Sequence, residues 1–143
     1  MTKTLFITGA SSGIGEATAK AAARAGWNVG LFARSTDELE KIAADIGDQA
    51  LVLTGDATKL DDQKDALAKL KDKFGSIDAA FANAGRWSSG AGIQEGDPTD
   101  WDGMVDLNIK GTLYTAHAAL PHLKPVKGQF LLTGSMAGRN HLK

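Results

Sequence analysis

The sequence predicts an α/β fold in which helices cover both faces of one parallel sheet. Short apolar segments alternate with longer segments of helical periodicity, an alternation typical of β-α-β units. Each short segment is almost continuously apolar, as expected for a strand buried on both faces. The 143 residues are near the usual length of one domain. We therefore expect a single domain with the order β-α-β-α-β-α-β-α-β.

Five short apolar segments are expected to be the strands of this sheet. Each is followed within two residues by Arg, Asn or Thr, which suit the loops at strand ends. The strands are predicted at Leu5–Ile7, Val29–Phe32, Leu51–Leu53, Ile77–Ala82 and Phe130–Leu132.

The first helix is predicted directly after the first strand, and Gly26 ends it. One stripe of mostly small residues is expected to face the sheet, because its members recur with the helical period. The stripe consists of Ile14, Ala17, Thr18, Ala21, Ala22 and Ala25.

The next two helices have predicted boundaries at both ends. Ser35 and Glu38 have the spacing of a capping box, and Gly47 ends that helix. Thr58 is expected to cap the third helix, which Gly75 ends. The inward-facing residues are predicted to be Leu39, Ile42, Ala43 and Ile46 in one helix and Leu60, Leu67, Leu70 and Phe74 in the other.

The fourth helix is predicted from about Pro98 to about Leu120. Asp97 suits the N-cap position and Pro98 the first helical position, and Pro121 is expected to end the helix. The segment before it, Arg86–Gly96, is rich in Gly and Ser and has no periodicity, so it is predicted to be a loop.

Composition excludes several classes of protein. The chain has 16 Lys and Arg against 17 Asp and Glu, which argues against nucleic-acid binding and a polybasic membrane anchor. No apolar run reaches the roughly 20 residues that cross a bilayer, and no signal peptide precedes the first strand. The chain has no cysteine, and its three histidines lack the spacing of metal ligands. We expect a cytoplasmic protein with no metal, nucleic-acid or membrane partner.

The most specific feature is the segment Thr8–Gly15, which lies between the first strand and the first helix. A helix N-terminus offers free N–H groups to a phosphate, and glycines let the phosphate approach the backbone. Ser11 and Ser12 add hydroxyl donors. Glu16 and Ala17 follow the last glycine where a P-loop requires Lys and Ser or Thr, so a P-loop is excluded. An ordinary Gly-rich turn is the alternative to a nucleotide site.

Five motifs in order make the chain resemble the classical short-chain dehydrogenases/reductases. The glycine spacing of TGASSGIG matches this type and disfavours a sugar-nucleotide epimerase, whose branch of the family spaces its glycines differently. The other motifs are Asn83-Ala84-Gly85 after the fourth strand, Asp56 after the third, Asn108 in the fourth helix and Ser135 after the fifth strand. The resemblance implies a Rossmann-type doubly wound sheet with strand order 3-2-1-4-5.

The resemblance also implies roles for individual residues. Asn108 would hold a water of the proton relay, and Ser135 would polarise a substrate carbonyl. Asn83 has a structural alternative, because its side chain can bridge neighbouring strand ends. The residues implied to bind the cofactor are Gly9, Ser11, Ser12, Gly13, Ile14, Gly15, Arg34, Ser35, Asp56, Ala57, Asn83, Ala84 and Gly85.

The end of the second strand bears on the choice of cofactor. An acidic residue near this point binds the ribose 2′-OH of NAD, whereas an Arg accommodates the 2′-phosphate of NADP. Here Arg34 follows Ala33, so the resemblance favours NADP over NAD, with Ser35 as a second contact. A solvent-exposed Arg at a strand end is the alternative.

One motif of the family is missing from these residues. The family's general acid/base is the Tyr of a Tyr-x-x-x-Lys motif, but Tyr114 is the only tyrosine and Ala118 stands where the Lys is required. We therefore expect residues 1–143 to be a single NADP-binding domain, the N-terminal part of a chain of about 250 residues. The intact enzyme would interconvert a small-molecule alcohol and a carbonyl by hydride transfer, as a homodimer or homotetramer. The alternative is a noncatalytic NADP-binding module or an inactive fragment.

Overall fold

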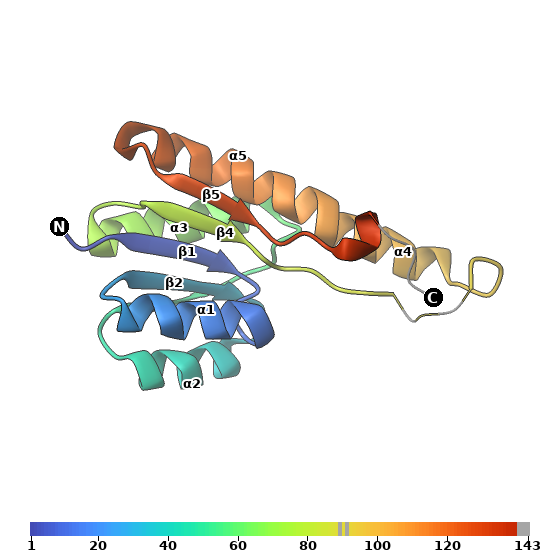
Figure 1. Ribbon diagram of the computed structural model, residues 1–143, viewed down its shortest axis with the longest axis horizontal. Coiled ribbons are helices and arrows are strands. Elements are labelled where there is room, and N and C mark those ends of the chain that lie inside the picture. Colours follow the sequence, from blue (N-terminus) through green and yellow to red (C-terminus); the bar gives the residue numbers. More distant parts are fainter. Residues whose placement is uncertain (89, 91, 140–143) are drawn as a thin grey trace.

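One five-stranded parallel sheet forms the centre of the protein (Figure 1). The computed structural model describes residues 1–88, 90 and 92–139. The strand order is β3-β2-β1-β4-β5, and every neighbouring pair runs parallel, so the predicted fold class and strand order are confirmed. The strands are β1 (Thr4–Thr8), β2 (Asn28–Ala33), β3 (Ala50–Thr54), β4 (Ala79–Ala82) and β5 (Gln129–Leu132).

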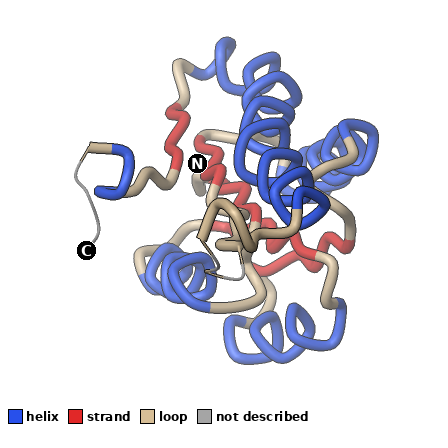
Figure 2. The backbone as a smooth tube through the Cα atoms, turned by 90° about the vertical axis from the view of Figure 1, so that its right-hand side faces the viewer, coloured by secondary structure: helices blue, strands red, loops and turns tan. Residues whose placement is uncertain are grey.

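Helices cover both faces of this sheet, as Figure 2 shows from the side. On one face, α1 (Gly13–Arg24) and α2 (Thr36–Ile46) pack against Leu5 and Ile7 of β1. On the other face, α3 (Leu60–Phe74) and α5 (Thr112–Leu123) pack against Phe6. Successive residues of β1 therefore enter opposite cores, because side chains alternate along a strand. The remaining elements are α4 (Pro98–Val105), the π-helix η1 (Asp106–Gly111) and the 3₁₀ turns η2 (Lys124–Val126) and η3 (Met136–Gly138).

Most of the predicted sheet-facing stripe of α1 is wrong, although its member Ala22 packs against the core. The buried residues of the helix are Gly15 and Ala19, whereas Ile14 is 62% exposed. The helix carries small residues on several sides, so periodicity alone does not select one face. Contact selects it instead, because a Cβ on Gly15 would lie 2.1 Å from the carbonyl oxygen of Gly9.

Two of the predicted helix caps are also wrong. Ser35 is the N-cap residue of α2, but its side chain forms no capping hydrogen bond. The N-cap of α3 is Lys59, and Thr58 instead donates its hydroxyl and its N–H to Asp56. The predicted cap at Asp97 is confirmed, since its carboxylate accepts the N–H of Thr99.

The predicted fourth helix is interrupted rather than continuous. It consists of α4, then the π-helical segment η1, then α5, which runs past Pro121 to Leu123. Pro121 does not end the helix, although a proline at this position donates no N–H to the carbonyl one turn earlier. The chain turns away at Lys127, whose φ of 52° is left-handed. The preceding loop has no helix or strand at residues 86–88, 90 and 92–96.

Candidate functional site

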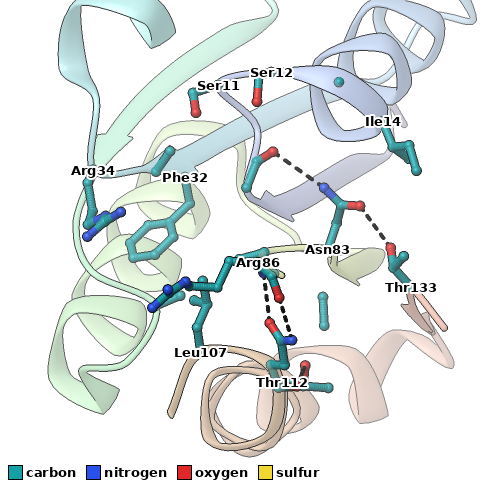
Figure 3. Close-up of a pocket in the computed structure, with 18 of the residues that line it drawn as sticks. Ser11, Ser12, Ile14, Phe32, Arg34, Asn83, Arg86, Leu107, Thr112 and Thr133 are labelled. Atoms are coloured by element: carbon teal, nitrogen blue, oxygen red, sulfur yellow. Dashed lines mark hydrogen bonds between the residues drawn. The ribbon is translucent and has the colours of Figure 1, made fainter. Parts of the chain in front are cut away.

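A cavity of about 730 Å³ opens at the carboxyl-terminal ends of β1, β2, β4 and β5 (Figure 3). The strand order reverses between β1 and β4, and ligands of open α/β sheets bind in the crevice at such a point. Of the residues predicted to form a site, Gly15 and Asp56 lie outside the lining. The others all line it: Gly9, Ser11, Ser12, Gly13, Ile14, Arg34, Ser35, Ala57, Asn83, Ala84, Gly85, Asn108 and Ser135.

The turn after β1 forms one wall of the cavity. Gly9 has a φ of 66°, and a Cβ at this position would lie 2.8 Å from the Cα of Ala84. Gly13 has a φ of 55°, and nothing lies within 4 Å of where its Cβ would be. Glycine is thus required at the first position by close packing. At the second, it leaves open space directly in front of the α1 N-terminus.

This open space suits an anionic group. The first N–H groups of a helix have no intrahelical partner, and the positive end of the helix dipole faces the same space. The hydroxyls of Ser11 and Ser12 lie beside it, and the Ser12 side chain forms no capping bond that would occupy it (Figure 3). The donor set and the absence of a side chain at Gly13 fit the pyrophosphate of a dinucleotide.

Asn83 joins three strand ends at the base of the cavity. Its amide Nδ2 donates to the carbonyl of Gly9 over 3.4 Å, and its Oδ1 accepts the hydroxyl of Thr133 at 2.8 Å (Figure 3). The hydroxyl of Thr8 in turn accepts the backbone N–H groups of Asn83 and Ala84. These contacts correspond to the bridging role that the sequence left open for Asn83.

Arg34, Ser35 and Ala57 lie at the end of the cavity formed by β2 and the loop after β3. Asp56 does not line the cavity, and its Oδ1 accepts the N–H and the hydroxyl of Thr58. Burial acts to raise the pKa of Asp56. The two bonds from Thr58 and the positive charges of Arg34 and Lys59 outweigh it, so the pKa lies below the ordinary 3.8.

Asn108 lies in η1 and holds the loop that follows β4. Its Oδ1 accepts the N–H of Arg86 and its Nδ2 donates to the carbonyl of Arg86, both at 2.8 Å (Figure 3). Its own carbonyl accepts the hydroxyl of Thr112 at 2.9 Å. The Arg86 side chain forms an ion pair with Asp100 of α4. One side chain therefore links the interrupted helix to the wall that contains Gly85.

Comparison with known proteins identifies the family. The sequence model described as short chain dehydrogenase matches residues 3–143. The chain belongs to the short-chain dehydrogenase family. An uncharacterized oxidoreductase of Staphylococcus saprophyticus is 41% identical over 141 residues, covering 95% of this chain and 60% of that protein. The serine 3-dehydrogenase of Agrobacterium fabrum is 39% identical over 137 residues, covering 96% and 55%.

Solved structures of short-chain dehydrogenases share the fold of this chain. The 3-ketoacyl-(acyl-carrier-protein) reductase of Brucella melitensis, complexed with NADH, superimposes with a TM-score of 0.91 at 34% identity, covering 97% of this chain and 60% of that one. An alcohol dehydrogenase of Thermococcus sibiricus, complexed with 5-hydroxy-NADP, gives 0.92 at 34%, covering 99% and 62%. The chain thus spans about 60% of the length of these proteins.

The remaining predicted residues occupy the open end of the site. Ser135 lines the cavity and is exposed, and its Oγ accepts the N–H of Ala137 at 3.1 Å. Trp87 lines the same cavity and is 68% exposed, whereas Trp101 packs against Gly96. Burial and the charge of Lys71 lower the pKa of His122, and His141 lies outside the described residues. Within the described part of the chain, no three His, Cys, Asp or Glu side chains group as metal ligands would.

Several lining residues of this short-chain dehydrogenase were not predicted from the sequence. Leu107 and Thr112 flank Asn108 on the interrupted helix, Arg86 follows the Asn-Ala-Gly segment, and Thr133 follows β5. Each of these four residues lies close in sequence to a predicted site residue, and this proximity is the only sequence feature that could have indicated them. Leu107 and Thr112 lie in or next to the π-helical segment η1, which has no pattern of its own in the sequence.

Proposed function

We propose that the protein is an NADP-dependent oxidoreductase that interconverts an alcohol and a carbonyl by hydride transfer, and that these 143 residues form the cofactor-binding part of a longer enzyme. The observation that carries the proposal is the unfilled space in front of Gly13, where a helix N-terminus meets the cavity. Membership of the short-chain dehydrogenase family supports the reaction class.

Different residues of this chain bind different parts of the cofactor. The N–H groups that begin α1 and the hydroxyls of Ser11 and Ser12 bind the pyrophosphate. Ala57, on the wall formed by the loop after β3, faces the adenine. When bound, the cofactor supplies or accepts the hydride.

Arg34 and Ser35 bind the 2′-phosphate that distinguishes NADP from NAD. Both line the cavity, and Ala33 occupies the place where an acidic residue would repel a phosphate. Among the similar solved structures, one holds NADH and another an NADP analogue, so both kinds of cofactor occur on this fold.

Ser135 acts at the substrate end. Its hydroxyl donates a hydrogen bond to the carbonyl oxygen of the substrate, which favours charge that develops there during reduction. Asn108 fixes the neighbouring wall through Arg86 and holds a water of the proton relay. The Tyr and Lys of the acid–base pair are not among these 143 residues, so the proton comes from elsewhere in the enzyme.

Turnover separates this proposal from a noncatalytic NADP-binding module, the alternative that the missing motif favours. Absorbance of NADPH is followed with a panel of ketones and aldehydes, for wild type, Ser135→Ala and the control Ser76→Ala, which lies outside the cavity. We expect oxidation that falls at least about a hundredfold in Ser135→Ala and is unchanged in Ser76→Ala. NADPH binding without turnover by the intact protein would establish the module instead.

The proposed setting is the cytoplasm. The chain contains no cysteine, and in the portion described by the structure every helix is too short or too polar to cross a membrane. We further propose that the enzyme is a homodimer or homotetramer. Val105, Ile109, Leu113 and Leu120 form an exposed apolar stripe along α4, η1 and α5, and a second copy of the same stripe is the partner that matches it.

A further inference from the structure

We propose that Gln63 is a positioning residue of the cofactor site, holding the loop after β3 against the π-helical segment that carries Asn108. Gln63 lies in the first turn of α3 and its side chain is fully buried. It does not line the cavity, and none of the motifs of the sequence includes it. The inference rests on the proposed function, since it concerns the placement of Ala57 beside the adenosine half of the cofactor.

Every polar atom of the Gln63 amide has a partner. Its Nε2 donates to the carbonyl of Ala57 at 2.8 Å and to the carbonyl of Gly111 at 3.1 Å. Its Oε1 accepts the hydroxyl of Thr115 at 2.7 Å. The opposite orientation of the amide would place its oxygen against two carbonyl oxygens, so the three contacts fix one orientation.

These bonds connect elements that are far apart in sequence. Ala57 belongs to the loop after β3 and lines the cavity, whereas Gly111 is the last residue of η1 and Thr115 lies in α5. The two backbones also meet directly, because a Cβ on Gly111 would lie 3.4 Å from the carbonyl oxygen of Ala57. The amide of Gln63 thus bridges the loop after β3 and the interrupted helix at a point where their backbones lie close together.

The same helix reaches the opposite wall through Asn108 and Arg86. Gln63 is therefore one end of a hydrogen-bonded series that joins the loop after β3 to the loop after β4. Burial of the Gln63 amide supports this role, because a buried amide destabilises the folded protein unless its polar atoms are hydrogen-bonded. An apolar residue of similar size would fill the space but leave the Ala57 carbonyl without this donor.

The test compares Gln63→Met with Ala66→Gly, which weakens the same helix at a buried position that touches neither carbonyl. Binding of 2′,5′-ADP and of NMN, which represent the two halves of the cofactor, is measured by calorimetry on the intact protein. We expect Gln63→Met to weaken 2′,5′-ADP about tenfold and NMN much less. Ala66→Gly should leave the ratio of the two affinities as in wild type.

Hydrogen exchange gives a second measurement that needs no cofactor. The N–H groups of Asp56 and Thr58 flank Ala57 and are hydrogen-bonded, so their exchange rates report whether the loop stays in place. We expect both to rise about tenfold in Gln63→Met but not in Ala66→Gly. Thr115→Val, which removes the hydroxyl that contacts both Oε1 of Gln63 and the carbonyl of Gly111, serves if Gln63→Met does not fold, and it should act in the same direction.

The outcomes separate the two proposals. If wild type binds neither fragment, the proposed function fails, and exchange alone then decides the role of Gln63. If wild type binds 2′,5′-ADP, and Gln63→Met or its substitute Thr115→Val binds it equally well with unchanged exchange at Asp56 and Thr58, Gln63 is only a core residue. Equal weakening of both fragments would also overturn the inference, since it indicates general loss of structure.

Discussion

Backbone and very short side chains make up much of the wall where the cofactor is proposed to bind. Gly9, Gly13, Ala57 and Ala84 all line the cavity, and none of them extends beyond a methyl group. A ligand there meets N–H groups and Cα atoms, so affinity depends on small changes in side-chain volume. Two glycines, Gly13 at the start of α1 and Gly26 just after its end, allow that dependence to be tested with matched strain.

Gly13→Ala is expected to abolish most cofactor binding while the fold survives. The new methyl group occupies the space proposed for the pyrophosphate and carries the strain of a left-handed φ, about 1 kcal/mol. Gly26→Ala carries the same kind of strain at the other end of α1, where φ is 86° and nothing lies near. Calorimetry with NADPH should show at least about a tenfold loss for Gly13→Ala and none for Gly26→Ala. Equal affinities would place the phosphate site elsewhere.

Arg34→Ala is expected to weaken NADPH binding much more than NADH binding. A charged hydrogen bond to a phosphate contributes about 1.5–3 kcal/mol, so the loss should be roughly tenfold to a hundredfold. Arg24→Ala, an exposed arginine outside this cavity, is the control. Fluorescence titration with both cofactors measures the ratio of affinities, and an identical loss for the two would contradict the assignment of NADP.

Asp56 predicts a specific dependence of stability on pH. Its pKa is lower in the folded protein than its ordinary 3.8, so its ionised form stabilises the fold above that value. The contribution is lost as pH falls through the lowered pKa. Asp56→Asn should therefore cost about 1 kcal/mol at pH 7 and progressively less below about pH 4. Urea unfolding at both pH values measures this, with the exposed Asp72→Asn as control. A cost independent of pH would refute it.

Among the elements, the interrupted helix contributes Leu107, Asn108 and Thr112 to the cavity lining. A continuous α-helix from Pro98 would have carried Asn108 at a different angle, because each π-helical turn inserts an extra residue. The segment η1 coincides with the point where the helix contacts two loops, at Arg86 through Asn108 and at Ala57 through Gly111. The interruption is therefore part of how the walls are assembled.

Asn108→Ala should loosen the loop after β4. Two hydrogen bonds to the backbone of Arg86 are removed at an exposed position, which costs about 1–2 kcal/mol locally. Exchange of the Arg86 N–H should rise by about tenfold, and it should not rise in Thr112→Val, which removes only the bond to the Asn108 carbonyl. Unchanged protection in Asn108→Ala would show that the ion pair of Arg86 with Asp100 holds the loop by itself.

Prediction from the sequence succeeded where a single physical requirement, such as burial, determines the pattern of residue types. The strands β1 and β2 are apolar because both faces are buried, so their positions followed from the pattern, and the strand order followed from the family resemblance. Most of the predicted stripe of α1 was wrong because alanines lie on several sides of the helix, so no side is clearly more apolar than the others. The side that faces the sheet is set by the close approach of Gly15 to Gly9. The contacts of Gln63 could not be predicted, since a polar residue in a first helical turn is usually exposed and only tertiary packing buries it.

At the scale of the whole molecule, the exposed stripe on α4, η1 and α5 is the feature proposed to mediate assembly. Leu113 is 61% exposed at its centre, and a charge there would be buried without a partner in a dimer. Leu113→Glu should shift the intact protein to monomer in sedimentation velocity, with no change in α1 or the sheet. Ala17→Glu, at an exposed position of α1, should leave the assembly unchanged. A wild type that is monomeric at micromolar concentration would exclude the proposed dimer.

The links made by Asn83 have a mechanical consequence. They fasten the end of β1 to the end of β4 and to Thr133 beyond β5, so these strand ends cannot separate without breaking several hydrogen bonds together. The floor of the crevice is therefore stiff. Any adjustment of its width to different ligands must come from the rims, at Arg34 on one side and at Trp87 on the other, where the exposed side chains are free to turn. Substrate range and cofactor choice can then diverge between relatives without altering the floor.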